Sequence, residues 1–164
     1  MSPATLENAS VRRVRDTLRA AGSDARVVEL AETARTANDA AAALGVEVGA
    51  IVKSLVFLVG GRPVMALVAG DRQCDVAALP AVLGLAGKAA QADADAVREA
   101  TGFAIGGVAP LGHPSPLPVA IDASLGRFTA VYAAAGHPFY VFATTLDELA
   151  RVTSGVVSET VGKA

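Results

Sequence analysis

The sequence contains few of the residues that mark disulfide-rich or metal-binding proteins. Its 164 residues include one cysteine, Cys74, two histidines, His113 and His137, and no tryptophan. A single cysteine excludes an internal disulfide and is compatible with a reducing compartment. Because Cys74 lies far from both histidines in the chain and neither H-E-x-x-H nor C-x-x-C spacing occurs, we expect no zinc centre. We expect Cys74 to be a small hydrophobe beside the core rather than a reactive thiol.

Long apolar runs and a large net charge are also lacking. No uninterrupted apolar run reaches the roughly 18 residues of a membrane span, and the N-terminus lacks the apolar region of a signal peptide, so we expect a cytoplasmic protein. The formal net charge of −2 gives no overall attraction to nucleic acid, so such a partner would need a local patch. The best candidate patch is Arg12, Arg13, Arg15 and Arg19, with a solvated helix face as the alternative.

Apolar side chains are abundant and spread in short runs along the chain. Hydrophobic residues make up 52% and charged residues 18%, which suits one domain over residues 1–164 with a well-filled core. Helical periodicity predicts a helix over residues 4–21. Capping patterns predict further helices that begin after Thr36, Asp75, Asp93 and Thr145.

Runs of branched and aromatic residues predict about six strands. The predicted strands lie at residues 25–30, in a hairpin over residues 51–69, and at residues 118–122, 129–134 and 139–143. Gly60 and Gly61 are expected to form the hairpin turn. Because a tight hairpin joins antiparallel strands, the sheet cannot be all parallel. We therefore predict an α/β (mixed α+β) domain with a curved mixed sheet and helices packed outside it.

Lys53 interrupts the apolar run I-V-K-S-L-V-F in the first strand of this hairpin. Side chains alternate along a strand, so Lys53 shares a face with Ile51 and Leu55, and Ser54 points to the other face. Both faces are apolar, and an ammonium there needs a partner, a ligand or access to water. Lys53 therefore either faces a functional cleft or reaches water near the strand entrance. The alternation excludes a dyad between Lys53 and Ser54, and we expect Ser54 to be a packed or hydrogen-bonded hydroxyl.

A loop rich in glycine and proline follows residue 101. Its composition, G-F-A-I-G-G-V-A-P-L-G-H-P-S-P-L-P, forbids a helix or a central strand. Gly106 and Gly107 let the backbone approach a ligand closely, and such a loop can aim amides at an anion or a developing oxyanion. The alternative is a tight crossing between a helix and a strand. The loop has the spacing of neither a P-loop nor a dinucleotide site.

Four motifs occur in a specific order and spacing. They are T-x-x-D-A-A-x-x-L-G-V (Thr36 to Val46), I-V-K-S-L-V-F (Ile51 to Phe57), A-L-V-A-G-D (Ala66 to Asp71) and T-G-F-A-I-G-G-V-A-P-L-G (Thr101 to Gly112). Together they resemble the YbaK/EbsC family, which includes free-standing relatives of the editing domain of prolyl-tRNA synthetase. The similarity covers about residues 10–152. It implies a mixed α/β fold with a barrel-like sheet, and hydrolysis of the ester that joins a wrong amino acid to tRNA.

The resemblance also implies roles for particular residues. Lys53 would hold the carbonyl of the substrate or its terminal ribose and phosphate, and the amides of Gly106 and Gly107 would face the developing oxyanion. An aminoacyl ester is already activated, so positioning, a water molecule and charge stabilisation are enough for hydrolysis. Either water or a hydroxyl of the terminal ribose would attack. No metal or organic cofactor is implied.

We expect a small substrate pocket, because editing domains discriminate amino acids by size. Alanine, serine, threonine, cysteine and short non-protein amino acids are all candidates. His137, between two predicted strands, either lines the pocket or is a polar loop tip. The expected substrate-binding residues are Ser54, Pro110, Gly112, Asp122, Gly136 and His137.

Two other functions stay open from the sequence. One is a non-catalytic module of the same fold that binds an amino acid or a tRNA end, and the other is a hydrolase of small-molecule esters. For the editing function, the expected partners are the acceptor end of an aminoacyl-tRNA and an aminoacyl-tRNA synthetase. We expect no membrane association and a monomer or weak homodimer.

Overall fold

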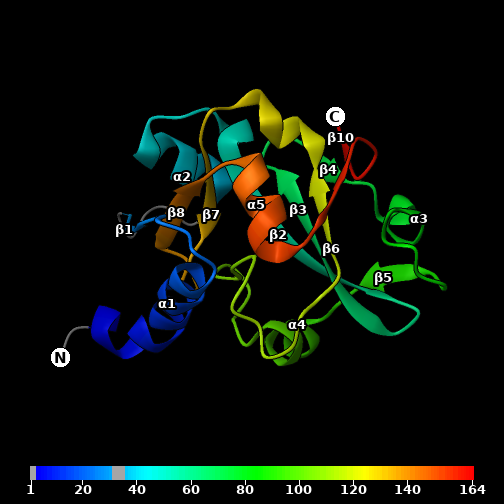
Figure 1. Ribbon diagram of the computed structural model, residues 1–164, viewed down its shortest axis with the longest axis horizontal. Coiled ribbons are helices and arrows are strands. Elements are labelled where there is room, and N and C mark those ends of the chain that lie inside the picture. The colour runs from blue at the N-terminus through cyan, green and yellow to red at the C-terminus, as the bar shows by residue number, and fades with distance from the viewer. Residues whose placement is uncertain (1–2, 31–35) are drawn as a thin grey trace.

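The computed structural model describes residues 3–30 and 36–164, and in these ranges it has five α-helices and ten strands (Figure 1). The helices are α1 (Pro3–Ala20), α2 (Ala37–Leu44), α3 (Leu79–Leu83), α4 (Ala94–Thr101) and α5 (Leu146–Thr153). The strands are β1 (Val27–Glu29), β2 (Ile51–Val59), β3 (Arg62–Ala69), β4 (Gln73–Cys74), β5 (Ala89–Gln91), β6 (Val119–Asp122), β7 (Val131–Ala134), β8 (Tyr140–Thr144), β9 (Val156–Ser158) and β10 (Gly162–Lys163).

The main sheet has eight strands and mixes parallel with antiparallel pairs. Its order is β1-β8-β7-β2-β3-β6-β9, and β5 pairs with β2 outside this path. The pairs β2–β7, β3–β6 and β6–β9 are parallel, and the others are antiparallel. This confirms the predicted mixed α+β class. No pairing joins the end strands β1 and β9 within the described ranges, so closure into a barrel-like sheet stays a prediction.

The predicted hairpin forms the centre of the sheet. β2 and β3 pair in register from Val52 opposite Ala69 to Val59 opposite Arg62. Gly60 has φ 57° and Gly61 has φ 83°, the left-handed values that a tight hairpin turn requires. These positive angles explain the glycine pair at this turn.

One face of the sheet carries the largest part of the core. α1, α4 and α5 cover this face (Figure 1), and Val14, Val97 and Leu149 of these helices pack in one cluster with Val52 and Val56 of β2. Only alternate side chains of β2 point to this face, so the side chains between them need cover on the opposite face.

The opposite face is covered by α2 and α3. Leu79 of α3 packs with Phe57 and Val68, and Ala41 of α2 packs with Ile51. β2 is therefore covered on both faces, as its two apolar faces predicted, and Lys53 lies on the face of α2 and α3.

The predicted helix starts are right in three places and wrong in one. Thr36 and Asp39 form a reciprocal capping box at α2, and Asp93 and Thr145 each accept a main-chain N–H at the start of α4 and α5. Asp75 makes no capping hydrogen bond, and the helix predicted after it is a 3₁₀ turn followed by the short helix α3. Pro80 explains the break, since proline belongs in the first turn of a helix.

The strand count predicted from sequence was too low. β4, β5, β9 and β10 are only two or three residues long and are exposed or intermediate over most of their length. Strands this short carry no periodic signal, because they are defined by the neighbour that pairs with them. In the part of the chain that the structure describes, no helix has the length and apolar character needed to cross a membrane.

We expect Asp122→Ala to destabilise the protein. The buried carboxylate of Asp122 accepts the main-chain N–H of Ala69 at 3.1 Å and of Ser124 at 2.9 Å, and so joins the ends of β3 and β6. Alanine removes both acceptors, and the buried amide of Ala69 left unpaired costs about 1–3 kcal/mol of the free energy of unfolding. Urea denaturation measures the change. Ser124→Ala keeps the amide and is the matched control, with an expected change within ~0.5 kcal/mol. Equal stability of the two variants would contradict this role for Asp122.

Candidate active site

The middle of β2 has a strand neighbour on one edge only. On its other edge, β7 pairs with the first two residues of β2 and β5 pairs with the last three. Lys53 to Val56 therefore face a gap between β7 and β5. Along a strand, the main-chain N–H and C=O groups of successive residues point to alternate edges. The carbonyl of Ile51 accepts the N–H of Gly70, so the odd-numbered residues of β2 bond to β3 and the even-numbered ones point to the other edge. The main-chain amides and carbonyls of Ser54 and Val56 therefore point into the gap.

A cavity of about 250 Å³ opens at this gap. Lys53, Ser54 and Gly106 line it together, with walls from β2, α2, β7, β8 and the loop between α4 and β6. Most of the other lining side chains are apolar, among them Ile51, Leu55, Tyr132, Pro138 and Val141. A second cavity of about 190 Å³ continues along β2 toward β5 and shares Ser54 and Gly106 with the first. The predicted lysine and glycine loop therefore meet at one place.

The ammonium of Lys53 has a fixed partner. It donates a hydrogen bond to the main-chain carbonyl of Arg72, in the turn after β3, and the side chain is half-buried. The sequence left two settings open for Lys53, a functional cleft or a position that reaches water near the strand entrance. In the structure Lys53 lines the wall of a cavity. An ammonium has three donors, so the contact with Arg72 leaves two for a ligand.

The turn that presents the Arg72 carbonyl is itself held by side chains. Asp71 forms a two-point ion pair with Arg127, with N–O distances of 2.9 and 2.8 Å. The hydrogen bonds from Arg127 lower the pKa of the Asp71 carboxyl, so the pair stays ionised at neutral pH. Lys53 is thus anchored to a main-chain segment whose position is set by a separate contact.

Ser54 carries a buried polar atom, its Oγ, that lacks a hydrogen-bond partner in the described ranges. The hydroxyl was expected to be packed or hydrogen-bonded, and it is packed only. A buried hydroxyl without a partner is unfavourable, which makes Ser54 available to a ligand in either cavity.

The two glycines of the loop have different environments. Gly106 has φ 97° and lines both cavities, and no acceptor for its N–H is found in residues 3–30 and 36–164. Gly107 is buried against the backbone of His137, where a Cβ atom would lie 2.8–3.0 Å away. Its N–H donates to the carbonyl of Ala104 at 3.1 Å. The expectation that both amides face an oxyanion is therefore corrected, and only Gly106 has an amide to offer.

The turn that follows β7 supports this loop. Gly136 has φ 95°, and a Cβ atom there would lie 2.9 Å from the carbonyl oxygen of Ser10. The ring of His137 packs edge-on against Phe139 and Tyr140, with centroid distances of 5.2 and 5.3 Å, and its Nδ1 accepts the N–H of Phe139. Neither Gly136 nor His137 lines the cavity of Lys53. They position the neighbouring segment, which includes Gly107.

Three residues expected to bind substrate lie elsewhere. Pro110 and Gly112 line a different cavity, of about 310 Å³, together with Arg13. Asp122 is at the end of β6, on the far side of β3 from the gap, and its carboxylate is occupied by main-chain amides. The strand order explains why Asp122 is not in the cavity, because β6 pairs with β3 and not with the open edge of β2.

Two contributors to the site were missed from the sequence. Ile105 lines both cavities with 63% of its surface exposed, and the signal in the sequence was an isoleucine directly before a glycine pair in a loop. The carbonyl of Arg72 is a main-chain atom, and no residue type marks it.

The chain is similar to known proteins over most of its length. Residues 31–152 match the family model of the aminoacyl-tRNA editing domain. Uncharacterized protein YwhH of Bacillus subtilis (strain 168) is 35% identical over 126 residues, which cover 76% of this chain and 79% of YwhH. A proline–tRNA ligase of Geobacter sp. (strain M21) is 36% identical over 91 residues, and these cover 56% of this chain but only 16% of the ligase.

Solved structures share the whole fold. A crystal structure described as a candidate trans-editing enzyme for prolyl tRNA synthetase is 42% identical, with a TM-score of 0.86 and coverage of 98% of both chains. The crystal structure of hypothetical protein APE2540 is 28% identical, with a TM-score of 0.83 and coverage of 92% of this chain and 99% of that one.

The setting of Cys74 gives a test of where the amine of Lys53 lies. Burial raises the pKa of the Cys74 thiol to about 11, and the positive charge of Lys53 opposes part of this rise. Below that pKa the thiol is protonated, so at pH 8 iodoacetamide should react on the order of 10²-fold more slowly with the folded protein than with the denatured protein. The rate should rise as the pH approaches 11. Lys53→Met should move this rise to higher pH, and an unchanged profile would show that the amine is not near Cys74.

Proposed function

Because the chain belongs to the aminoacyl-tRNA editing domain family, we propose that it removes wrongly attached amino acids from tRNA by hydrolysing the ester bond. One observation carries the proposal. Lys53, Ser54 and Gly106 line one small cavity at the gap beside β2, and the buried Ser54 hydroxyl has no hydrogen-bond partner among the described residues. This combination supplies a positive charge, a neutral polar group and a main-chain donor around a space that fits an amino acid.

The proposed reaction needs no strong nucleophile. A water molecule attacks the carbonyl carbon of the aminoacyl ester, and the bond between that carbon and the ribose oxygen breaks. The free amino acid leaves as its carboxylic acid, and a proton from the water ends on the ribose hydroxyl. A ribose hydroxyl that relays the proton is compatible with the same site. The protein would contribute by positioning the ester and by stabilising charge on its carbonyl oxygen.

Each polar group has a proposed task. The two free donors of the Lys53 ammonium would hold the terminal ribose and phosphate or the ester carbonyl. The N–H of Gly106 would face the developing oxyanion, and the fixed turn around Gly136 and His137 would keep that amide in place. The main-chain groups of Ser54 and Val56 would bind the amino group of the substrate, in the way an open sheet edge binds an extended chain.

The size of the cavity favours a small amino acid. Its volume of about 250 Å³, with about 190 Å³ in the adjoining second cavity, lies at the low end of the roughly 300–1,000 Å³ of pockets that hold drug-sized ligands. We propose alanine, serine, threonine, cysteine or a similar amino acid as the substrate. Each additional methylene in such a pocket changes binding by about 1–3 kcal/mol.

The relatives favour tRNA for proline. One relative is a proline–tRNA ligase, and one similar structure is described as a candidate trans-editing enzyme for prolyl tRNA synthetase. We propose that this chain acts on the product of that synthetase when a smaller amino acid has been attached by mistake. The synthetase itself would then be a natural partner.

Lys53→Met should abolish deacylation without unfolding the protein. Methionine keeps the length of the side chain but removes its charge and donors, and loss of such a stabilising group costs about 10²–10³ in kcat. The release of amino acid from a panel of mischarged tRNAs, proline tRNA included, measures the effect. Lys88→Met, at an exposed lysine outside the cavity, is the matched control and should keep parental activity. Cleavage at the parental rate by Lys53→Met would overturn the proposed site, and tRNA binding without turnover by the parent protein would favour the binding module.

Ser54→Ala should change selectivity rather than stability. The hydroxyl has no partner in the described part of the chain, so its removal should leave the free energy of unfolding unchanged or slightly higher. If Ser54 recognises the amino acid, the ratio of kcat/KM for seryl-tRNA to that for alanyl-tRNA should change about tenfold, close to the value of one hydrogen bond. Ser115→Ala, at an exposed position, should leave the ratio as it was. An unchanged ratio in Ser54→Ala would exclude contact between Ser54 and the amino acid.

A further inference from the structure

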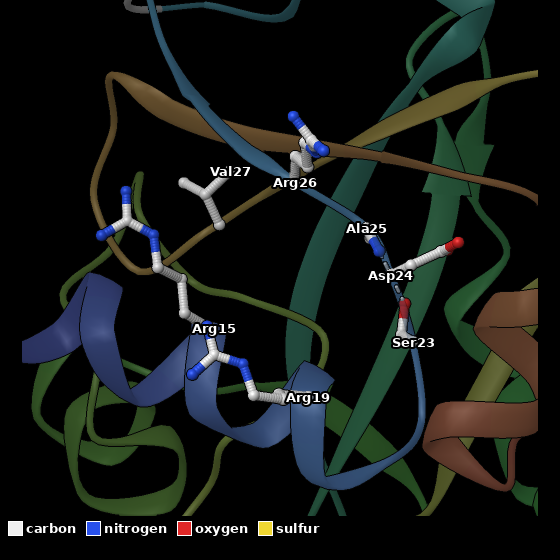
Figure 2. A pocket seen from close by; sticks show the side chains of 7 residues that line it. All are labelled: Arg15, Arg19, Ser23, Asp24, Ala25, Arg26 and Val27. Carbon is white, nitrogen blue, oxygen red and sulfur yellow. Dashed lines mark hydrogen bonds between the residues drawn. The ribbon is translucent and has the colours of Figure 1, made fainter.

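A second concave surface lies between the end of α1 and the start of β1. It encloses about 370 Å³, and Arg15, Arg19 and Arg26 line it with Asp24 and Val27. Figure 2 shows Arg15 extending from the helix toward Val27, Arg19 lying along the helix toward Arg15, and Arg26 on the facing strand segment. We call this surface the arginine groove. Neither the cavity of Lys53 nor the loop of Gly106 is part of it.

The arginine groove is positively charged in an acidic protein. Three arginines against one aspartate give it a net charge of +2, whereas the chain has a net charge of −2. A concave surface of one sign concentrates its field and attracts counter-ions. Its ligand is therefore expected to be an anion.

The guanidinium groups of the groove have no partner among the residues that the structure describes. No ion pair or hydrogen bond of the Arg15, Arg19 or Arg26 guanidinium is found within the described ranges, although Arg127 and Arg151 elsewhere both have carboxylate partners. Arg15 and Arg19 are also four residues apart on one helix, a spacing at which like charges repel. An anion bound between these arginines would relieve this repulsion.

The structure divides the arginine patch that the sequence predicted. Arg13 turns inward, and its guanidinium lies 4.5 Å from the ring centroid of Phe103. Arg15 and Arg19 line the groove instead, where Arg26, which is distant from the patch in the sequence, joins them. A solvated helix face would need no such third arginine from a separate element.

The groove lies close to the candidate active site. Val141 of β8 lines the cavity of Lys53, and its register partner on β1 is Val28, two residues after Arg26. Paired strands are about 5 Å apart, so one strand spacing separates the wall of the cavity from β1. The strand that borders the groove therefore lies next to a strand that lines the cavity.

We propose that the arginine groove binds backbone phosphates of the same tRNA whose aminoacyl end occupies the cavity. Guanidinium groups match phosphate geometrically by two parallel hydrogen bonds. Such contacts carry no sequence information, and they would give the protein affinity for RNA independent of the amino acid. This inference rests on the proposed function only for the identity of the RNA.

The test is the salt dependence of tRNA binding by the full-length protein. Uncharged proline tRNA is titrated at 50 to 200 mM salt with the parent, with Arg15→Gln, Arg19→Gln and Arg26→Gln, and with the triple variant. Each groove substitution should lower the slope of log affinity against log salt by about 1. Arg62→Gln and Arg98→Gln, at exposed arginines outside the groove, are the matched controls and should keep the parental slope.

The outcomes separate this inference from the proposed function. Parental slopes in all groove variants, with deacylation intact, would overturn the inference and leave the function standing. Groove-dependent tRNA binding in a protein that hydrolyses no mischarged tRNA would support the inference and overturn the function. A parallel titration with inorganic phosphate tests whether the groove binds a free phosphate ion instead of the phosphates of RNA. Arginine-dependent phosphate binding combined with unchanged tRNA slopes would show that the groove holds a small anion, and would also overturn the inference.

Discussion

The site depends on an interruption in the pairing of β2. β7 and β5 pair with opposite ends of one edge of this strand, so Lys53 to Val56 have no strand neighbour on that edge. A central strand normally has both edges satisfied, because an unpaired main-chain group away from water is costly. The gap therefore creates both the space for a ligand and a row of donors and acceptors to bind it.

Rigid neighbours surround this gap. The amine of Lys53 is tied to the Arg72 carbonyl, and the turn that bears this carbonyl is held by the pair of Asp71 and Arg127. On the other side, Gly107 fits against the backbone of His137 with no room for a Cβ atom. The groups assigned to the substrate are thus positioned by contacts that do not involve the substrate, which is the arrangement that electrostatic catalysis requires.

Several features were predictable because they depend on local chemistry. The capping box of Thr36 and Asp39 and the glycine turn after β2 follow from short-range hydrogen bonds and from φ angles. The unusual position of Lys53, a charged residue in a strand with two apolar faces, followed from the alternation of side chains alone. Asp122 was placed wrongly, because a buried aspartate that caps main-chain amides looks the same in a sequence as one that binds a ligand. The second amide of the glycine pair was also misassigned, since its acceptor, Ala104, is set by the path of the loop.

By itself the sequence determined most of the longer helices and strands, the two apolar faces of β2 and the residue types of the site, because alternation, capping and turn chemistry act over a few residues. Only the tertiary structure decided where the sheet is open and which of those residues meet there. β5 and β7 come from segments far from β2 in the chain, and their partial pairing with it is set by long-range packing. The grouping of Arg26 with Arg15 and Arg19 has the same origin, since a helix and a strand must fold together before their charges share one groove.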